Sequence, residues 1–160
     1  MSTPTATAHA PGQRPAGIVV GVDGSESAGS ALRWALEEGA VRGVPVHVLY
    51  VWTRPGVSFP AIPAPGSGEA ANALLGGVMS RVGDVLRART PASPVTSQTV
   101  EGRPAAVLID QATDAQLLVV GTRGSGGFAG LLLGSVSHQC TAHAFCPVVV
   151  IHDQTTRSWS

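Results

Sequence analysis

Five short segments rich in apolar and β-branched residues recur along the chain. Most are nearly continuous apolar runs, a pattern typical of strands that are buried on both faces of a parallel sheet. The segment Val95–Gly102 alternates only in part, which favours an edge position. The predicted strands are Gly17–Val22, Pro45–Trp52, Val95–Gly102, Gln116–Gly121 and Cys146–Asp153.

Segments with apolar residues at helical spacing separate these strands. Asp23 and Ser25 are both possible caps for the first helix, which Gly43 and Pro45 end. The predicted helices are Ser27–Arg42, about Glu69–Arg89, Pro104 to about Thr113, and one that begins near Gly134–Ser135. Strands alternating with helices predict a parallel, doubly wound α/β sheet, which binds ligands beyond the carboxyl ends of its strands. The loops after the first and fourth strands are therefore expected to meet.

Length and composition indicate one folded domain. The chain has 160 residues, of which 44% are hydrophobic and 12% charged, whereas disordered chains show the opposite balance. We expect the domain to span residues 17–152, between a disordered tail at 1–16 and a short tail at 153–160. The first tail lacks the apolar core of a signal peptide, and no apolar stretch is long enough to span a bilayer.

Charge and cysteine content narrow the function further. Ten basic residues, all arginine, balance ten acidic residues, so nothing in the charge favours a nucleic-acid or membrane partner. The absence of lysine excludes a P-loop phosphate lysine and Schiff-base chemistry. With only Cys140 and Cys146, a disulfide scaffold is disfavoured, and we expect a protein of the reducing cytoplasm.

A glycine-rich loop follows the fourth predicted strand and leads into the last predicted helix. Glycines allow the backbone to approach a ligand closely, and the free N–H groups of a helix start attract anions. Ser135 adds a hydroxyl donor and Arg123 a permanent charge, so the segment is a candidate phosphate cradle. The alternative is a loop that is merely flexible.

The spacing Gly121-x2-Gly124-x9-Gly134-Ser135 resembles the G-x2-G-x9-G-[ST] signature of ATP-binding universal stress proteins. The opening IVVGVDGSESA and the close GSVSHQCTAHAFCPVVVI are similar to that family too. The resemblance extends from about Gly17 to Ile151. It implies a five-stranded Rossmann-like sheet of order 3-2-1-4-5, related to the adenine nucleotide alpha hydrolases, and ATP bound together with Mg²⁺.

The resemblance also implies site residues. Asp23 corresponds to the aspartate that faces the nucleoside near the metal; the alternative, from the residue alone, is a helix cap or turn residue. Val51 corresponds to the residue whose backbone recognises adenine, and Gly21 and Val22 complete the part of the site before Asp23. The residues that correspond to the ribose and phosphate contacts are Gly121, Arg123, Gly124, Gly134, Ser135 and Val136.

Other kinds of site are less favoured. Gly124–Ala129 fits a dinucleotide-binding G-x-G-x-x-A pattern, but it follows the fourth strand and has no acidic residue in the expected place. His138, Cys140, His143 and Cys146 do not have the spacing of a structural zinc site. No G-x-S-x-G nucleophile elbow is present.

We therefore predict an adenine-nucleotide-binding stress sensor or regulator and not a fast enzyme. The alternatives are a slow ATPase, an AMP- or cAMP-binding variant, and a nucleotide-free dimeric interaction module. The apolar last strand predicts an exposed edge, and the resemblance implies a homodimer through Val148, Val149 and Val150. The proline-rich segment Thr53–Gly68 is a candidate lid over the site.

Overall fold

The fold is a single five-stranded parallel sheet with the order β3-β2-β1-β4-β5. The computed structural model describes residues 16–53, 67–88, 93–122 and 133–153. Its elements are β1 (Ile18–Val22), α1 (Glu26–Arg42), β2 (Val46–Trp52), α2 (Ser67–Ala88), β3 (Val95–Glu101), α3 (Pro104–Gln111), β4 (Leu117–Gly121), α4 (Ser135–His143) and β5 (Val148–Ile151). The predicted fold class and strand order are confirmed, and both β3 and β5 lie at edges, as expected.

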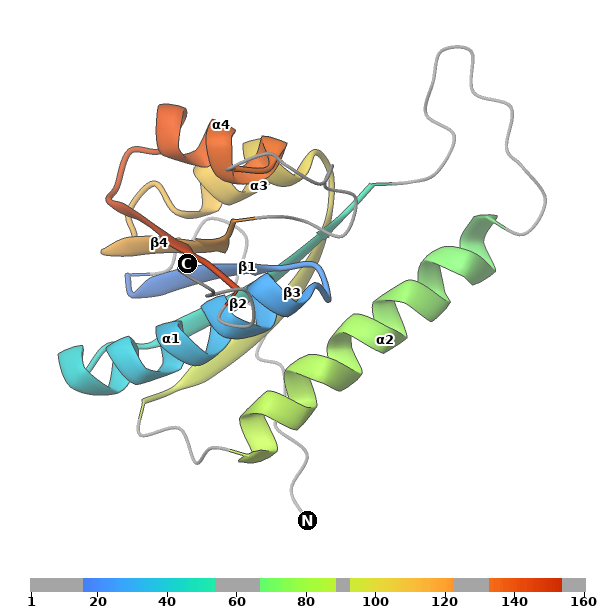
Figure 1. Cartoon of the computed structure of the whole chain (residues 1–160), viewed down its shortest axis with the longest axis horizontal. Helices are drawn as coiled ribbons and strands as arrows, with labels where there is room; N and C mark the ends of the chain where they lie inside the picture. The colour runs from blue at the N-terminus through green and yellow to red at the C-terminus, as the bar shows by residue number, and fades with distance from the viewer. Residues whose placement is uncertain (1–15, 54–66, 89–92, 123–132, 154–160) are drawn as a thin grey trace, which may run out of the picture.

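Helices cover both faces of the sheet (Figure 1). On one face, α1 and α2 enclose an apolar cluster that contains Ile18, Val20, Leu32 and Val78. On the other, α3 and α4 lie over a second cluster that contains Val19, Leu118 and Cys140. Strands β1 and β4 contribute residues to both clusters, which explains why their sequences are apolar without alternation.

Several predicted boundaries are wrong by one or two residues, and prolines and a helix cap account for three of them. Strands β2 and β5 begin after Pro45 and Pro147, which have no N–H to donate to the ladder. Helix α1 begins at Glu26 because the Ser25 hydroxyl accepts the Ala28 N–H at 3.2 Å. Helix α3 ends at Gln111, and α2 begins at Ser67.

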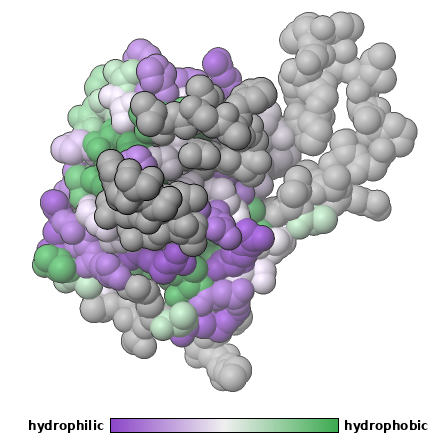
Figure 2. All heavy atoms as spheres, viewed as in Figure 1, coloured by the Kyte–Doolittle hydropathy of each residue, from purple (hydrophilic) through white to green (hydrophobic). Residues whose placement is uncertain are grey.

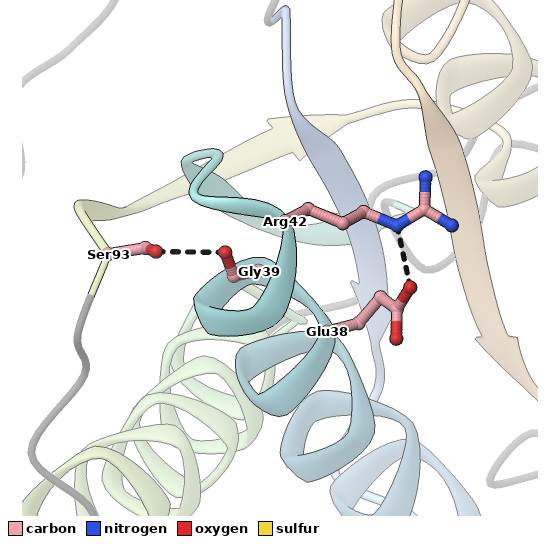
Figure 3. Close-up of polar contacts among 4 residues, drawn as sticks. All are labelled: Glu38, Gly39, Arg42 and Ser93. Carbon is pink, nitrogen blue, oxygen red and sulfur yellow. Dashed lines mark hydrogen bonds and ion pairs between the residues drawn. The ribbon is translucent and has the colours of Figure 1, made fainter.

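The carboxyl end of α1 is attached to the segment that leads into β3. Gly43 closes the helix with φ of 65°, a left-handed conformation that favours glycine. The Ser93 hydroxyl donates to the Gly39 carbonyl at 2.9 Å, while Arg42 pairs with Glu38 at 2.6 Å on the helix surface (Figure 3). The Ser93 bond joins α1 to the start of β3 at the end of the molecule opposite the carboxyl edge of the sheet, whereas the Arg42–Glu38 pair lies within α1.

Among the described helices, none combines the length and the apolar character that a bilayer crossing requires. The predicted tails fall almost entirely on residues 1–15 and 154–160, and the predicted lid on 54–66. These ranges lie outside the described residues.

Candidate functional site

The candidate site lies at the carboxyl edge of the sheet, where the strand order reverses. Strands β1 and β4 are neighbours in the centre of the sheet, with Val20 opposite Val119. Asp23 follows β1 directly, and Thr122 follows β4 directly. Because parallel strands end at the same edge, the fold brings the Asp23 turn and the end of β4 to the same side of the molecule.

The Asp23 turn is held by its own hydrogen bonds. The Asp23 Oδ1 atom accepts the Ser25 N–H at 2.9 Å, and Ser25 in turn caps α1. Gly24, between them, has φ of 84°, which favours glycine. Asp23 thus serves as a turn residue, and Ser25 is the helix cap. The carboxylate is half-buried and fixed in direction.

Tyr50 lies next to this carboxylate on β2. It pairs in register with Val22, the residue before Asp23. Burial, and secondarily the negative charge of Asp23, raise the pKa of the Tyr50 phenol above its ordinary value of 10.0. The phenol is therefore a neutral hydrogen-bonding group beside the Asp23 charge at neutral pH.

The start of α4 is attached to the end of β4. The Gly134 N–H donates to the Thr122 carbonyl at 2.6 Å, and the Ser137 hydroxyl donates to the same carbonyl at 3.0 Å. The Thr122 N–H donates to the Ile151 carbonyl at 3.0 Å, which ties this point to β5. Gly134 is the N-cap of α4 and provides no side-chain acceptor for the first N–H groups of the helix. Ser135 and Val136 are the first two residues of that helix, so their N–H groups lie at its positive end.

Two of the predicted site glycines lie in close contact with helices. A Cβ at Gly121 would lie 2.8 Å from the Ser27 carbonyl carbon, because α1 approaches β4 closely there. A Cβ at Gly21 would lie 2.9 Å from Leu108 Cδ1 on α3. Gly121 is the last residue of β4 and Gly21 the last but one of β1, so both lie near the candidate site, but their immediate neighbours are helices.

The predicted apolar site residues lie around the same edge. Val22 is buried at the end of β1, whereas Val51 and Val136 are partly buried against the cluster under α3 and α4. The pairing of β1 with β2 ends at Val22 and Tyr50, so Val51 lies one residue beyond it and pairs with Val100 on β3. Arg123 and Gly124 lie outside the described residues.

The sequence did not predict three residues that shape this edge. Tyr50 lies beside Asp23, Ser137 supports the start of α4, and Arg81 of α2 donates to the Gly24 carbonyl. The Ser137 hydroxyl is buried and faces Thr122, fifteen residues earlier, and Arg81 is 57 residues from Gly24. Only the three-dimensional fold brings such pairs together. Within the described residues no group of three or more His, Cys, Asp or Glu side chains is arranged to hold a metal ion.

Comparison with known proteins gives the family. Residues 17–152 match the model of the Universal stress protein family. A curated universal stress protein of Mycobacterium tuberculosis is 35% identical over 144 residues, which cover 86% of this chain and 48% of that protein. The chain spans about half the length of the curated relatives it matches.

Solved structures give the same picture. A universal stress protein in complex with cAMP is 26% identical with a TM-score of 0.59, and the match covers 89% of this chain and all of the other. The universal stress protein from Archaeoglobus fulgidus in complex with dAMP is 25% identical with a TM-score of 0.58, covering 87% of this chain and 99% of the other.

Proposed function

The chain belongs to the universal stress protein family, and on that premise we propose that it binds an adenine nucleotide at the carboxyl edge of its sheet. The preferred nucleotide is ATP with Mg²⁺, and its occupancy makes the protein a stress-response regulator in the cytoplasm. The main observation behind the proposal is that two features lie at the same edge of the sheet. The fixed Asp23 carboxylate follows β1, and the start of α4, which lacks a side-chain cap, is attached to the adjacent strand β4.

The start of α4 supports a role in phosphate binding. Its first N–H groups have no side-chain acceptor from Gly134, and the helix dipole adds partial positive charge there. The Thr122 carbonyl fixes the direction of the helix through Gly134 and Ser137. In the proposal, Gly134, Ser135 and Val136 hold phosphates, with Gly121, Arg123 and Gly124 of the same signature.

The ends of β1 and β2 are proposed to hold the nucleoside. Val51 extends beyond the last β1 pair, so one side of its backbone faces the space past Val22 and can hydrogen-bond a base. In the proposal, Gly21 and Val22 lie under the nucleoside beside Val51, and Asp23 contacts the ribose.

The residues fit a magnesium ion that accompanies the nucleotide. Mg²⁺ is usually held by one or two carboxylates together with phosphate oxygens, and Asp23 is a carboxylate of fixed orientation at this edge. Such an ion neutralises phosphate charge that the α4 dipole balances only in part.

The named ligands of the solved relatives support adenine recognition. Two family members at 25% identity or more are described in complex with cAMP and with dAMP. Their common part is the adenine nucleoside monophosphate. ATP is preferred here because of the glycine signature, and slow hydrolysis or an AMP- or cAMP-binding variant remains the alternative.

Calorimetric titration of ATP with Mg²⁺, cAMP and AMP into the purified chain tests the proposal. Gly134→Val is the first variant. Gly134 has φ of −71° and ψ of 169°, which valine adopts without strain, so the added side chain blocks the approach of a phosphate. Asp23→Asn keeps the acceptor for the Ser25 N–H but removes the charge. Asp114→Asn is the matched control, because this exposed aspartate precedes β4 at the opposite edge of the sheet.

We expect the wild type and Asp114→Asn to bind ATP equally, Gly134→Val not to bind, and Asp23→Asn to lose most of the Mg²⁺ dependence. Thermal unfolding of each variant shows whether it is folded. If the wild type binds none of the three nucleotides, the proposal is wrong and the nucleotide-free dimeric module becomes the leading interpretation. If the wild type binds ATP, a measurement of phosphate release separates a slow ATPase from a sensor.

We also propose a homodimer through the β5 edge. Val148, Val149 and Val150 are only half-buried on an edge strand, and Phe145 just before them is 78% exposed. Exposed apolar edges of this kind favour pairing with a second strand.

A further inference from the structure

The carboxyl-terminal half of helix α2 packs against the sheet. Val78 and Val82 are buried at 6% and 4% exposure, and Val85 and Leu86 pack partly against the same cluster. Gly76 and Gly77 are exposed, with no atom within 4 Å of the position of a Cβ. In Figure 1 the amino-terminal end of α2 extends away from the sheet. Among the residues of α2 whose burial the structure describes, those that pack against the sheet lie between Val78 and Leu86.

This stretch also contacts the Asp23 turn directly. Arg81 donates from Nη1 to the carbonyl of Gly24. Val78 packs against the same residue, because its Cγ2 lies 3.0 Å from the position that a Gly24 Cβ would take. Two side chains one helical turn apart on α2 thus hold one glycine of the turn.

Gly24 lies between Asp23 and Ser25, the two residues that form the turn at the candidate site. Asp23 carries the carboxylate, and Ser25 donates its N–H to that carboxylate and caps α1. With φ of 84°, Gly24 sets the direction of the chain at both neighbours. A shift of the Gly24 carbonyl must therefore turn the Asp23 carboxylate or break its bond to Ser25.

We propose that Arg81 is a positioning residue for the nucleotide site and that it couples nucleotide occupancy to the docking of α2. The inference rests on the proposed function, since it concerns the same site. By thermodynamic linkage, if docking of α2 favours nucleotide binding, then nucleotide binding favours docking of α2 by the same factor. Helix α2 is then the element through which occupancy changes the surface that other molecules meet.

The expected coupling is modest because Arg81 is exposed and its hydrogen bond competes with water. Loss of one charged donor to a carbonyl should weaken nucleotide binding by about three- to tenfold. Arg81→Met removes the donor and keeps the aliphatic stem, whereas Arg81→Lys keeps a charged donor. Arg87→Met is the matched control, because Arg87 lies on the same helix and pairs with Asp84 on the surface, where the two side chains are 72% and 68% exposed.

The experiment is amide hydrogen exchange, measured by mass spectrometry with and without ATP and Mg²⁺, alongside calorimetric affinity. In the wild type and in Arg87→Met, saturating ATP should slow exchange over residues 78–88. In Arg81→Met, affinity should fall and the slowing over 78–88 should disappear even at saturation. Arg81→Lys should restore both at least in part. A role of Arg81 in fold stability alone would not remove the nucleotide-dependent slowing.

The outcomes distinguish this proposal from the proposed function. If Arg81→Met binds ATP as the wild type does and keeps the slowing, the coupling is wrong although the function stands. If the wild type binds no nucleotide, the proposed function and the coupling both fail. The nucleotide-free samples test separately whether Arg81 stabilises the Asp23 turn. If it does, Arg81→Met should speed amide exchange at Ser25–Ala28. Unchanged exchange there overturns the positioning role.

Discussion

At the residue scale, the glycines of the signature differ in why a side chain would or would not be tolerated. Gly121 faces Ser27 of α1 so closely that any side chain would push the helix off the sheet. A substitution at Gly121 therefore tests the fold and not the ligand. Gly134 has an extended conformation that other residues adopt, so its backbone does not require glycine. This difference makes Gly134 the informative position for the phosphate site.

Cys140 is the residue for which the structure gives the clearest dependence of stability on pH. Its side chain is fully buried, and burial, with a smaller contribution from nearby Cys146, raises the pKa of the thiol from its ordinary value of 9.0 to about 11. The folded protein keeps this proton where the unfolded chain loses it. The stabilisation is therefore complete below pH 9 and is lost as pH rises from 9 to about 11.

We predict that the free energy of unfolding falls by about 2–3 kcal/mol over that range because of Cys140. Chemical denaturation of the wild type and Cys140→Ala at pH 8 to 11 measures it. The variant should be less stable at pH 8 because of the cavity, yet show a shallower decline. Tyr50 also has a raised pKa and contributes a decline that both proteins share. Parallel declines in the two proteins would contradict the prediction.

At the scale of elements, helix glycines separate into packed and open positions. Gly39 in α1 faces β2, where a Cβ would lie 2.5 Å from Val46 Cγ2. Gly77 in α2 is exposed and has no atom within 4 Å of a Cβ. The first glycine is needed for the approach of the helix to the sheet, and the second only adds backbone freedom to the unfolded chain.

We predict that Gly77→Ala stabilises the protein by about 0.5–1 kcal/mol, the usual difference between alanine and glycine inside a helix. Gly39→Ala should destabilise it, since Val46 and the chain beside it must move. Equilibrium unfolding in urea measures both. A destabilising Gly77→Ala would mean that the open side of α2 is covered in solution by another part of the chain or by a second copy.

The elements themselves were predictable because their patterns are local. All five strands and four helices were expected from apolar runs and helical spacing, and the edge position of β3 from its partial alternation. Boundaries were less predictable, since they depend on single caps such as Ser25 and on prolines such as Pro45. The candidate site was predicted through Asp23 and the start of α4. Arg81 and Tyr50 were not, because their positions beside the Asp23 turn depend on the packing of distant elements.

At the scale of the whole molecule, the two edges of the sheet differ in chemistry. Strand β3 carries the polar residues Thr96, Ser97, Gln98 and Thr99, whereas every residue of β5 (Val148–Ile151) is apolar. On the face seen in Figure 2, hydrophilic and hydrophobic residues are interspersed in small patches. Among the described residues the exposed large apolar side chains are Val41, at 82%, and Phe145, at 78%. Only Phe145 adjoins the apolar edge, which makes it a suitable probe of the proposed dimer.

We predict that light scattering after size exclusion finds a dimer for the wild type and that Phe145→Glu shifts it toward monomer. Burial of one phenylalanine is worth about 1.5–3 kcal/mol, so the dissociation constant should rise about tenfold or more. In a two-fold dimer the change occurs twice. Val41→Glu adds the same charge to an equally exposed apolar position in the last turn of α1, which is not part of the β5 edge, and should leave the dimer intact. If the wild type is monomeric at all concentrations, the proposed β5 dimer is wrong. If both variants lose the dimer equally, the effect is one of added charge alone.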